Sequence, residues 1–135
     1  MEEQMEPQSE IVPVVQVRNM GIIAIHVSDI ARSARFYKEI LGFREGEQML
    51  SPGLSLEAND ISIYLCNGRA PRRKEQMQYA EISLCFVVKG VKDAFDKLTA
   101  AGVEVMEPYE AGSEYFATCA IADPDGNMIE IWGNP

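Results

Sequence analysis

Apolar residues follow a helical period in two places, one in each half of the chain. The two sets are Ile30, Ala34, Tyr37 and Leu41, and then Val91, Ala94, Phe95, Leu98 and Ala101. A glycine that can stop a helix follows each set, and the two stops, Gly42 and Gly102, lie 60 residues apart. The pattern predicts amphipathic helices over Ile30–Leu41 and Val91–Ala101.

Strand-like segments surround both predicted helices in the same order. One apolar segment precedes each helix, Gly21–Val27 in the first half and Ile82–Val88 in the second. Three more follow each helix: Phe43–Met49, Leu54–Ala58 and Ile61–Cys66, then Val103–Met106, Tyr115–Ile121 and Met128–Trp132. The chain is therefore predicted to be α+β, built from two copies of a βαβββ module. Because Gly21–Val27 lacks clean alternation, we expect both faces of that strand to be covered.

The segments outside this repeat divide the chain. Residues 1–20 are predicted to be an N-terminal tail or arm: residues 1–10 carry four acids and little to bury, and Pro13 limits Ile11–Val17 to an edge strand or an extended arm. Residues 21–135 form a single domain, with module one at about 21–68, a linker at 69–80 and module two at about 81–133. The linker holds four of the twelve basic residues, so an anion-binding loop is an alternative interpretation.

The last strand carries one ionisable residue. Asp-Pro-Asp-Gly-Asn at residues 123–127 gathers turn formers, and the alternation that follows places Met128, Glu130 and Trp132 on one face of the strand. If the opposite face, with Ile129 and Ile131, packs on a helix, Glu130 points toward whatever the sheet encloses. A carboxylate in a concavity is a ligand or a base, and the alternative is a solvated surface residue.

Charge and composition exclude several classes of binding partner. A formal net charge of −9 and a pI near 4.6 oppose binding to nucleic acid, which needs a basic surface. No apolar run is long enough to span a membrane, and the start of the chain lacks a basic signal region. Three cysteines in apolar runs, with no C-x-x-C pair, fit a reducing compartment. We therefore expect a cytoplasmic protein without a nucleic-acid or membrane partner.

Three stretches resemble the vicinal oxygen chelate superfamily, which includes glyoxalase I, extradiol dioxygenases and the fosfomycin- and bleomycin-resistance proteins. Residues 27–43 (VSDIARSARFYKEILGF) are similar to its first-module signature, 91–105 (VKDAFDKLTAAGVEV) to its second, and 123–130 (DPDGNMIE) to its closing turn and strand. The resemblance implies that the two modules form a curved mixed sheet around a cup-shaped cavity, usually completed by a second chain. A homodimer is therefore expected, although closure within one chain stays open.

The resemblance also implies where a family metal would bind. Metal-dependent members take one ligand, usually His or Glu, from the first and the last strand of each module. Those positions correspond here to Ile22, Tyr64, Ser83 and Glu130. Because only Glu130 is a good ligand and a divalent ion needs three or four donors, we expect no metal and no other cofactor. His26 and Glu81 share strand faces with Ile22 and Ser83 but lie roughly 13 Å and 7 Å along the strands, too far to replace them.

Two classes of function remain open. The first is a binding protein whose cup holds a small molecule without the family metal, with substrate contacts from His26, Tyr64, Glu81, Ser83, Met128 and Trp132. The second is an enzyme, either a lyase or isomerase in which Glu130 is the catalytic base, or a metal-dependent lyase, isomerase or dioxygenase with rearranged divalent-metal ligands. Cys85 would be a nucleophile only beside a base, and an inert thiol is the alternative. We favour binding, because nothing obvious would stabilise an enolate without a metal.

Overall fold

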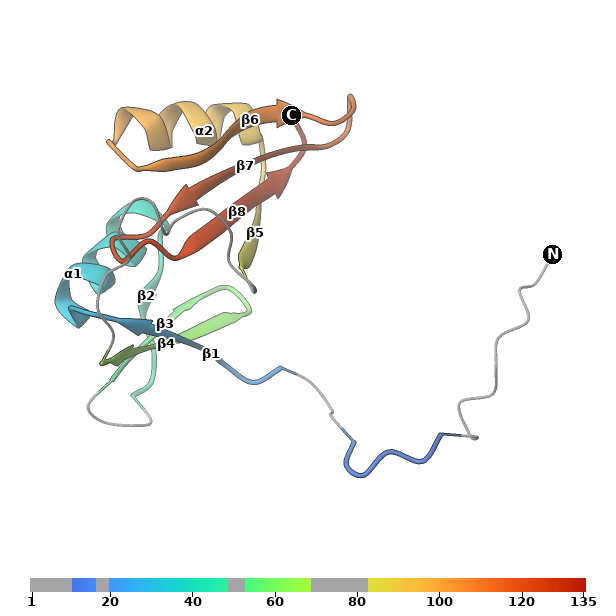
Figure 1. Ribbon diagram of the computed structural model, residues 1–135. Helices are drawn as coiled ribbons and strands as arrows, with labels where there is room; N and C mark the ends of the chain where they lie inside the picture. The colour runs from blue at the N-terminus through green and yellow to red at the C-terminus, as the bar shows by residue number, and fades with distance from the viewer. Residues whose placement is uncertain (1–10, 17–19, 49–52, 69–82) are drawn as a thin grey trace.

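The structure is a computed structural model that describes residues 11–16, 20–48, 53–68 and 83–135. Its elements follow one another in this order: β1 (Ile23–Val27), α1 (Ile30–Arg35), the π-helix η2 (Phe36–Ile40), β2 (Arg44–Glu45), β3 (Leu54–Ala58), β4 (Ile61–Asn67), β5 (Leu84–Val88), α2 (Val91–Ala100), β6 (Val105–Ala111), β7 (Ala117–Ala122) and β8 (Met128–Gly133). Each half runs strand, helix and three more strands, so the two predicted βαβββ modules are confirmed (Figure 1).

Each module builds its own four-stranded mixed sheet with the same strand order. Module one has the order β1-β4-β3-β2 and module two the order β5-β8-β7-β6, and in each the first strand runs parallel to the last. Ile23 and Leu84 occupy equivalent places before the two helices, and they stand opposite Ile63 and Ile129. The residues that follow Ile63 and Ile129 are Tyr64 and Glu130, so these two are equivalent. The residues that precede Ile23 and Leu84 are Ile22 and Ser83, which are likewise equivalent. The strand registers thus give the same correspondence as the family resemblance.

The two predicted helices are present, but the first is divided. Asp29 caps α1 by accepting a hydrogen bond from the backbone N–H of Arg32 at 3.1 Å, and the chain then widens into the π-helix η2 before Gly42 ends it at φ +78°. Sequence periodicity predicted one continuous helix here. The widened segment contains Tyr37, whose buried hydroxyl reaches the other module. The second helix ends as predicted at Gly102, with φ +81°.

Three strand boundaries differ from the sequence prediction. The strand after Gly42 is only Arg44–Glu45. Beyond it, the Gln48 side chain replaces a backbone partner and hydrogen-bonds both the N–H and the C=O of Ser55. The next difference is β6, which continues to Ala111 past Pro108 as an edge strand, where a missing N–H is tolerated. The last is at Phe116, which lies outside β7 and closes the loop from Ala111 by accepting bonds from Gly112 and Ser113.

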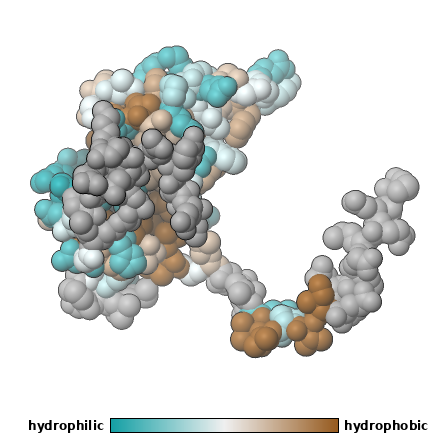
Figure 2. Space-filling model, viewed as in Figure 1, coloured by the Kyte–Doolittle hydropathy of each residue, from teal (hydrophilic) through white to brown (hydrophobic). Residues whose placement is uncertain are grey.

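Residues 11–16 lie outside both sheets. They form no helix or strand, and their apolar side chains are exposed, Val12 by 87% and Val14 by 100%. In Figures 1 and 2 this segment projects away from the domain as an apolar arm. Of the two predicted forms, edge strand or extended arm, the structure has the arm. The predicted acidic tail at 1–10, the linker at 69–80 and Glu81 lie outside the described residues.

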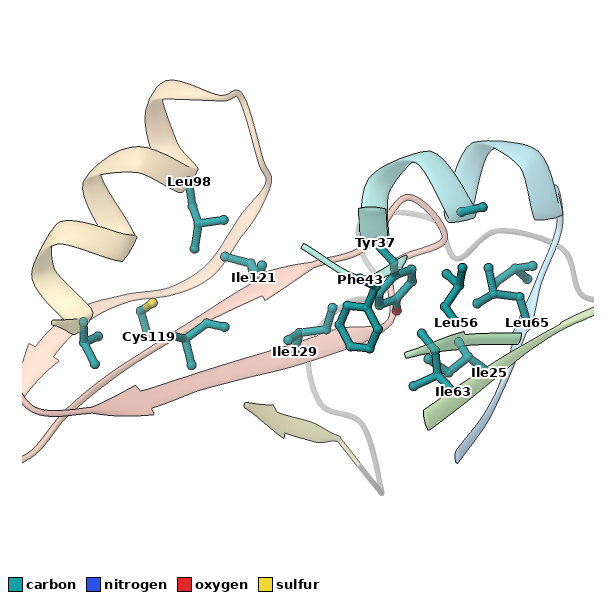
Figure 3. Packing of buried hydrophobic residues seen from close by; sticks show 14 of the residues in the cluster. Ile25, Tyr37, Phe43, Leu56, Ile63, Leu65, Leu98, Cys119, Ile121 and Ile129 are labelled. Atoms are coloured by element: carbon teal, nitrogen blue, oxygen red, sulfur yellow. The ribbon is translucent and has the colours of Figure 1, made fainter. Parts of the chain in front are cut away.

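The core fills the space between each sheet and its helix. Figure 3 shows Leu98 of α2 above Cys119 and Ile121, while Tyr37 and Phe43 pack beside Leu56. A contact between the Phe43 and Phe86 rings, with centroids 5.7 Å apart, joins the two halves of this core. In the described part of the chain, no helix is long and apolar enough to cross a membrane.

Only one face of β1 is covered in the single chain. Ile25 and Val27 are buried, whereas His26 is exposed and Ile22 is 37% exposed. The expectation that both faces would be covered was therefore wrong. The apolar residues of β1 pack toward α1, and none of the described helices and strands covers the opposite face.

Candidate functional site

The turn at residues 123–127 connects the two modules. Gly126 takes φ +83°, and its N–H donates to the carbonyl of Asp123 at 2.9 Å, which reverses the chain as the sequence predicts. The Asp123 carboxylate accepts bonds from the backbone N–H groups of Asp125 and Asn127 and from the Tyr37 hydroxyl at 2.8 Å. Burial first, and then the Asp123 carboxylate, raise the pKa of Tyr37 far above its usual value.

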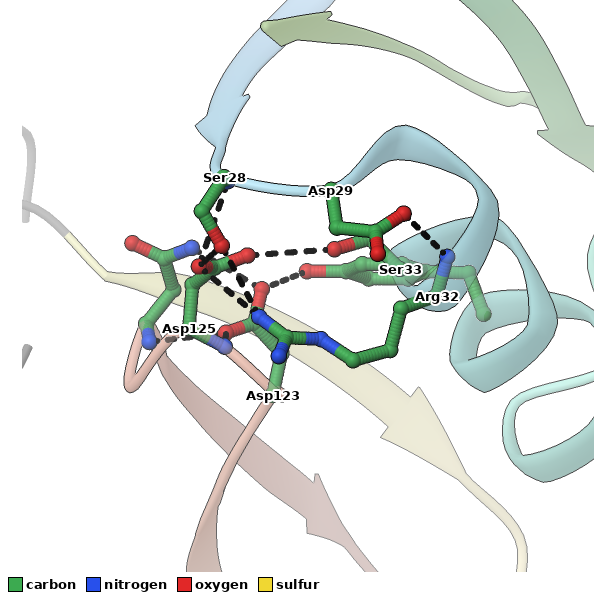
Figure 4. A network of polar contacts seen from close by, with 8 residues as sticks. Ser28, Asp29, Arg32, Ser33, Asp123 and Asp125 are labelled. Atoms are coloured by element: carbon green, nitrogen blue, oxygen red, sulfur yellow. Dashed lines mark hydrogen bonds and ion pairs between the residues drawn. The ribbon is translucent and has the colours of Figure 1, made fainter. Parts of the chain in front are cut away.

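The Asp125 carboxylate is buried at the start of α1 (Figure 4). It accepts hydrogen bonds from both the N–H and the hydroxyl of Ser28, from the Ser33 hydroxyl at 3.2 Å, and from the guanidinium of Arg32 at 3.2 Å. All these donors come from module one. The turn is thus an internal junction, whose acceptor atoms are already used by the protein.

Sequence reasoning missed this junction. It treated Asp123 and Asp125 as turn formers, although Ser33 and Tyr37 supplied a signal. Their polar groups fall on the side of the first helix that the apolar pattern assigns to the core, and buried polar groups need partners. The partners are more than 80 residues away along the chain, which is why local spacing gave no sign of them.

Glu130 lies on the opposite side of the module-two sheet from α2. Its neighbours in strand, Ile129 and Ile131, are buried under the helix, while Glu130 is half-buried and Trp132 is 38% exposed. We call the side of the module-two sheet turned away from α2 the open face; it carries Ser83, Cys85, Val87, Thr118, Glu130 and Trp132. The predicted alternation of this strand is therefore correct.

Both oxygens of Glu130 are held by neutral donors. The Ser83 hydroxyl donates to Oε2 at 2.7 Å, and the Trp132 indole N–H donates to Oε1 at 3.1 Å. Ser83 precedes β5, which runs parallel to β8, so the strand register places it beside the carboxylate. These two bonds fix the orientation of the carboxylate and of the indole ring together.

An aromatic pair adjoins this carboxylate. The rings of Trp132 and Phe116 meet edge to face, with centroids 5.2 Å apart and planes at 89°, and Phe116 is 39% exposed. Val87, which stands opposite Trp132 in the sheet, is 78% exposed. Sequence reasoning placed Phe116 in the strand Tyr115–Ile121 and did not select it as a site residue, whereas it lies in the loop before β7. The open face thus combines one anchored carboxylate with exposed apolar surface.

The other predicted site residues are less closely grouped. Met128 is buried at the start of β8 and is not part of the exposed surface. In module one, the Tyr64 hydroxyl accepts a hydrogen bond from the Gly53 N–H at 2.9 Å, and His26 is exposed beside Cys66. Glu81 is outside the described residues. Ser83 and Trp132 are therefore the predicted residues that the structure brings to Glu130.

Three cavities are formed by described residues away from Glu130. A groove of about 400 Å³ on the helix side is lined by Phe36, Ile40 and the turns at 101–104 and 122–124. A second, of about 210 Å³, lies between η2 and α2, and a third, of about 120 Å³, lies beside Ile22 and Ser55. None of these three is lined by Glu130, Trp132, Tyr64 or His26. Glu130 itself is half-buried, and Ala120, which stands opposite it in the sheet, is buried.

Cys85 stands opposite Glu130 in the sheet and is exposed. Partial burial of the thiol, and then the negative charge of Glu130, raise its pKa. A raised pKa lowers the thiolate fraction and with it the reactivity of the thiol. The nearby carboxylate therefore disfavours the hypothesis that Cys85 is a nucleophile.

The side chains at the four family metal positions do not fit a metal ion. Ile22 has no donor atom, the Tyr64 hydroxyl bonds the Gly53 backbone, and the Ser83 hydroxyl is bonded to Glu130 itself. Within the described ranges, no group of three His, Cys, Asp or Glu side chains is arranged to hold a metal. The donor set at these positions supplies a single carboxylate, which is too few for a divalent ion.

Comparison with known proteins identifies relatives across most of the chain. The family model described as Glyoxalase/Bleomycin resistance protein/Dioxygenase superfamily matches residues 19–131. Virulence protein STM3117 of Salmonella typhimurium is 28% identical over 114 residues, which cover 81% of this chain and 79% of that protein. Its crystal structure superposes with a TM-score of 0.66 at 25% identity, covering 90% of this chain and 100% of that one.

A second solved structure shows the same fold at lower identity. The fosfomycin resistance protein FosX of Listeria monocytogenes has a TM-score of 0.70 at 17% identity, covering 89% of this chain and 95% of that one. At this identity the likeness extends to the fold and no further.

Proposed function

The chain belongs to the Glyoxalase/Bleomycin resistance protein/Dioxygenase superfamily, and we propose that it binds a small molecule on the open face of module two without the family metal. The observation that carries this proposal is the Glu130 carboxylate, which Ser83 and Trp132 hold in a fixed orientation on an accessible surface. A pre-oriented polar group surrounded by aromatic and aliphatic side chains is typical of small-molecule sites. Glu130 would fix the orientation of the ligand, and Trp132 with Phe116 would contact its apolar part.

The proposal omits a metal because of the side chains at the family positions. Ile22 offers no donor, and both oxygens of Glu130 already accept hydrogen bonds from the protein. Loading a metal there would require breaking these bonds and recruiting ligands from other positions. A sequestering or carrier role needs no such centre.

We further propose that the binding site is completed by a second copy of the chain. Val87, Phe116 and Trp132 expose apolar surface on the open face, and β1 likewise leaves Ile22 and His26 uncovered. Exposed apolar patches of this kind mark surfaces that are covered by a partner or a ligand. In such a homodimer, each chain would cover the open face of the other, and each face would become part of an enclosed cup.

The cellular setting follows from charge and thiols. Cys66, Cys85 and Cys119 are all unpaired, which suits a reducing compartment such as the cytoplasm. A net charge of −9 disfavours nucleic acid as a partner. The proposed partners are therefore a small molecule and a second copy of the chain.

Metal content tests the metal-free part of the proposal. Protein purified without chelator should contain no stoichiometric transition metal by mass spectrometry, and chelator should leave its melting temperature unchanged. Small carbonyl compounds should not be turned over, with or without added divalent ions. One Zn, Ni, Mn or Fe per chain, lost together with activity in Glu130→Gln, would replace this proposal with a metalloenzyme.

The dimer is tested by light scattering, which should report twice the chain mass. Val87→Glu places a charge on the apolar open face and should shift the population toward monomer. Glu39→Gln, on the exposed surface of η2, is the control and should leave the mass unchanged. A wild-type monomer at micromolar concentration would disprove the shared site.

A further inference from the structure

The four strands of module two have an uneven charge content. They contain three glutamates and no Lys, Arg or His: Leu84–Val88, Val105–Ala111, Ala117–Ala122 and Met128–Gly133. Glu107 stands opposite Ala120 and Glu110 opposite Thr118, and these partners lie on the same side of the sheet as Glu130 and Trp132. The register between β6 and β7 shifts on both sides of Glu107, whereas Glu110 follows Tyr109, whose ring packs on Phe95 of α2. Glu110 therefore lies with Glu130 on the open face.

None of the ion pairs of the described residues neutralises Glu130. Its two hydrogen bonds come from a hydroxyl and an indole N–H, neither of which carries charge. The cations of α2 are paired on the other side of the sheet, Lys92 with Asp96 and Lys97 with Asp93. This differs from the junction, where Asp125 is paired with Arg32.

The aromatic pair adds a second feature of the same kind. Trp132 and Phe116 are both more than one-third exposed, and the bond from the indole N–H to Glu130 holds the Trp132 ring in place. Indole and phenyl faces attract cations, and an adjoining carboxylate adds a direct charge attraction. These four strands carry no positive side chain that could pair with an anionic ligand. A purely apolar ligand would remove water from the Glu130 carboxylate without offering it a polar or charged partner.

We infer that the ligand of the open face is a small organic cation, an amine carried on an apolar or aromatic body. Its ammonium group lies beside Glu130, and its body packs on Trp132 and Phe116. This inference rests on the proposed function, since it names the ligand class of the same face. It goes beyond that function by committing to the sign of the ligand's charge.

Three probes of matched shape test the charge preference: 4-phenylbutylamine, 4-phenylbutan-1-ol and 4-phenylbutanoate. All three carry a phenyl ring on a four-carbon chain, and their end groups are positive, neutral and negative at neutral pH. Trp132 is the sole tryptophan of the chain, so its emission reports binding at this face directly. Calorimetric titration of the full-length protein provides a readout that does not depend on the indole.

The amine should bind about tenfold more tightly than the carboxylate, the size expected for one partly exposed charge pair, with the alcohol between them. Glu130→Gln should remove most of that preference and leave the affinity for the alcohol nearly unchanged. Glu39→Gln removes an equal charge from the exposed surface of η2 and should preserve the preference.

Other outcomes separate the two proposals. If the carboxylate binds as tightly as the amine, or more tightly, the cation inference is wrong while small-molecule binding at this face stands. If the preference survives in Glu130→Gln, the carboxylate does not set it and the inference is also wrong. If none of the three probes changes Trp132 emission or releases heat, binding at this face and the cation inference fail together.

Discussion

Asp125 and Glu130 are five residues apart, yet their carboxylates have opposite surroundings. Asp125 is fully buried, its donors all come from module one, and one of them is the guanidinium of Arg32. Glu130 is half-buried, and its two donors are neutral and belong to module two. A fully partnered buried carboxylate holds modules together, whereas an anchored but accessible one is free to meet a ligand. Within a single turn and strand, the difference separates an acid that joins the modules from one that we propose contacts a ligand.

The largest expected effect is on stability, from Asp125→Ala. This change removes the acceptor of the buried Ser33, the half-buried Ser28 and the partly exposed Arg32, and should reduce the free energy of unfolding by about 3 kcal/mol. Glu130→Ala is the matched truncation and should cost about 1 kcal/mol or less, because Ser83 and Trp132 can turn to water. Urea unfolding of both variants measures the difference. Equal losses would mean that the junction does not join the modules.

Tyr37→Phe tests the junction through the pH dependence of stability. Because the pKa of Tyr37 is raised, the folded state keeps a proton that the unfolded chain loses above about pH 10. The stability from this hydroxyl is therefore fully present below pH 10 and lost as pH rises beyond it. Tyr37→Phe should cost about 1 kcal/mol at neutral pH and should flatten the alkaline decline. Unfolding curves across that range measure it, and an unchanged alkaline slope would contradict the role of the Tyr37–Asp123 bond.

Glu130→Gln should have the smallest effect on folding and a specific effect on Cys85. Removing the charge removes the second cause of the raised thiol pKa, so the thiolate fraction of Cys85 should increase at a given pH. Alkylation followed by peptide mass spectrometry should show faster labelling of Cys85, with the buried Cys119 unchanged as the internal control. An unchanged labelling rate at Cys85 would show that the Glu130 charge does not raise the pKa of this thiol.

Much of the fold follows from local sequence signals. The helical periods, the stops at Gly42 and Gly102 and the alternation around Ile129 and Ile131 each depend on residues close in the chain. The strand at Phe43–Met49 was overestimated, since only the fold brings the Gln48 side chain to the Ser55 backbone. Of the proposed site, the sequence identified Glu130, Ser83 and Trp132 but not the ring of Phe116.

The sequence by itself determined two βαβββ modules, a face shared by Glu130 and Trp132, and a first strand without a metal donor at Ile22. Those properties are set by periods of a few residues and by side-chain chemistry. Only the tertiary structure decided that Asp125 binds Ser28, which is 97 residues away, and that Ser83 holds Glu130 across 47 residues. Such pairings depend on strand register and module docking. Both are fixed by the packing of the whole core rather than by any local pattern.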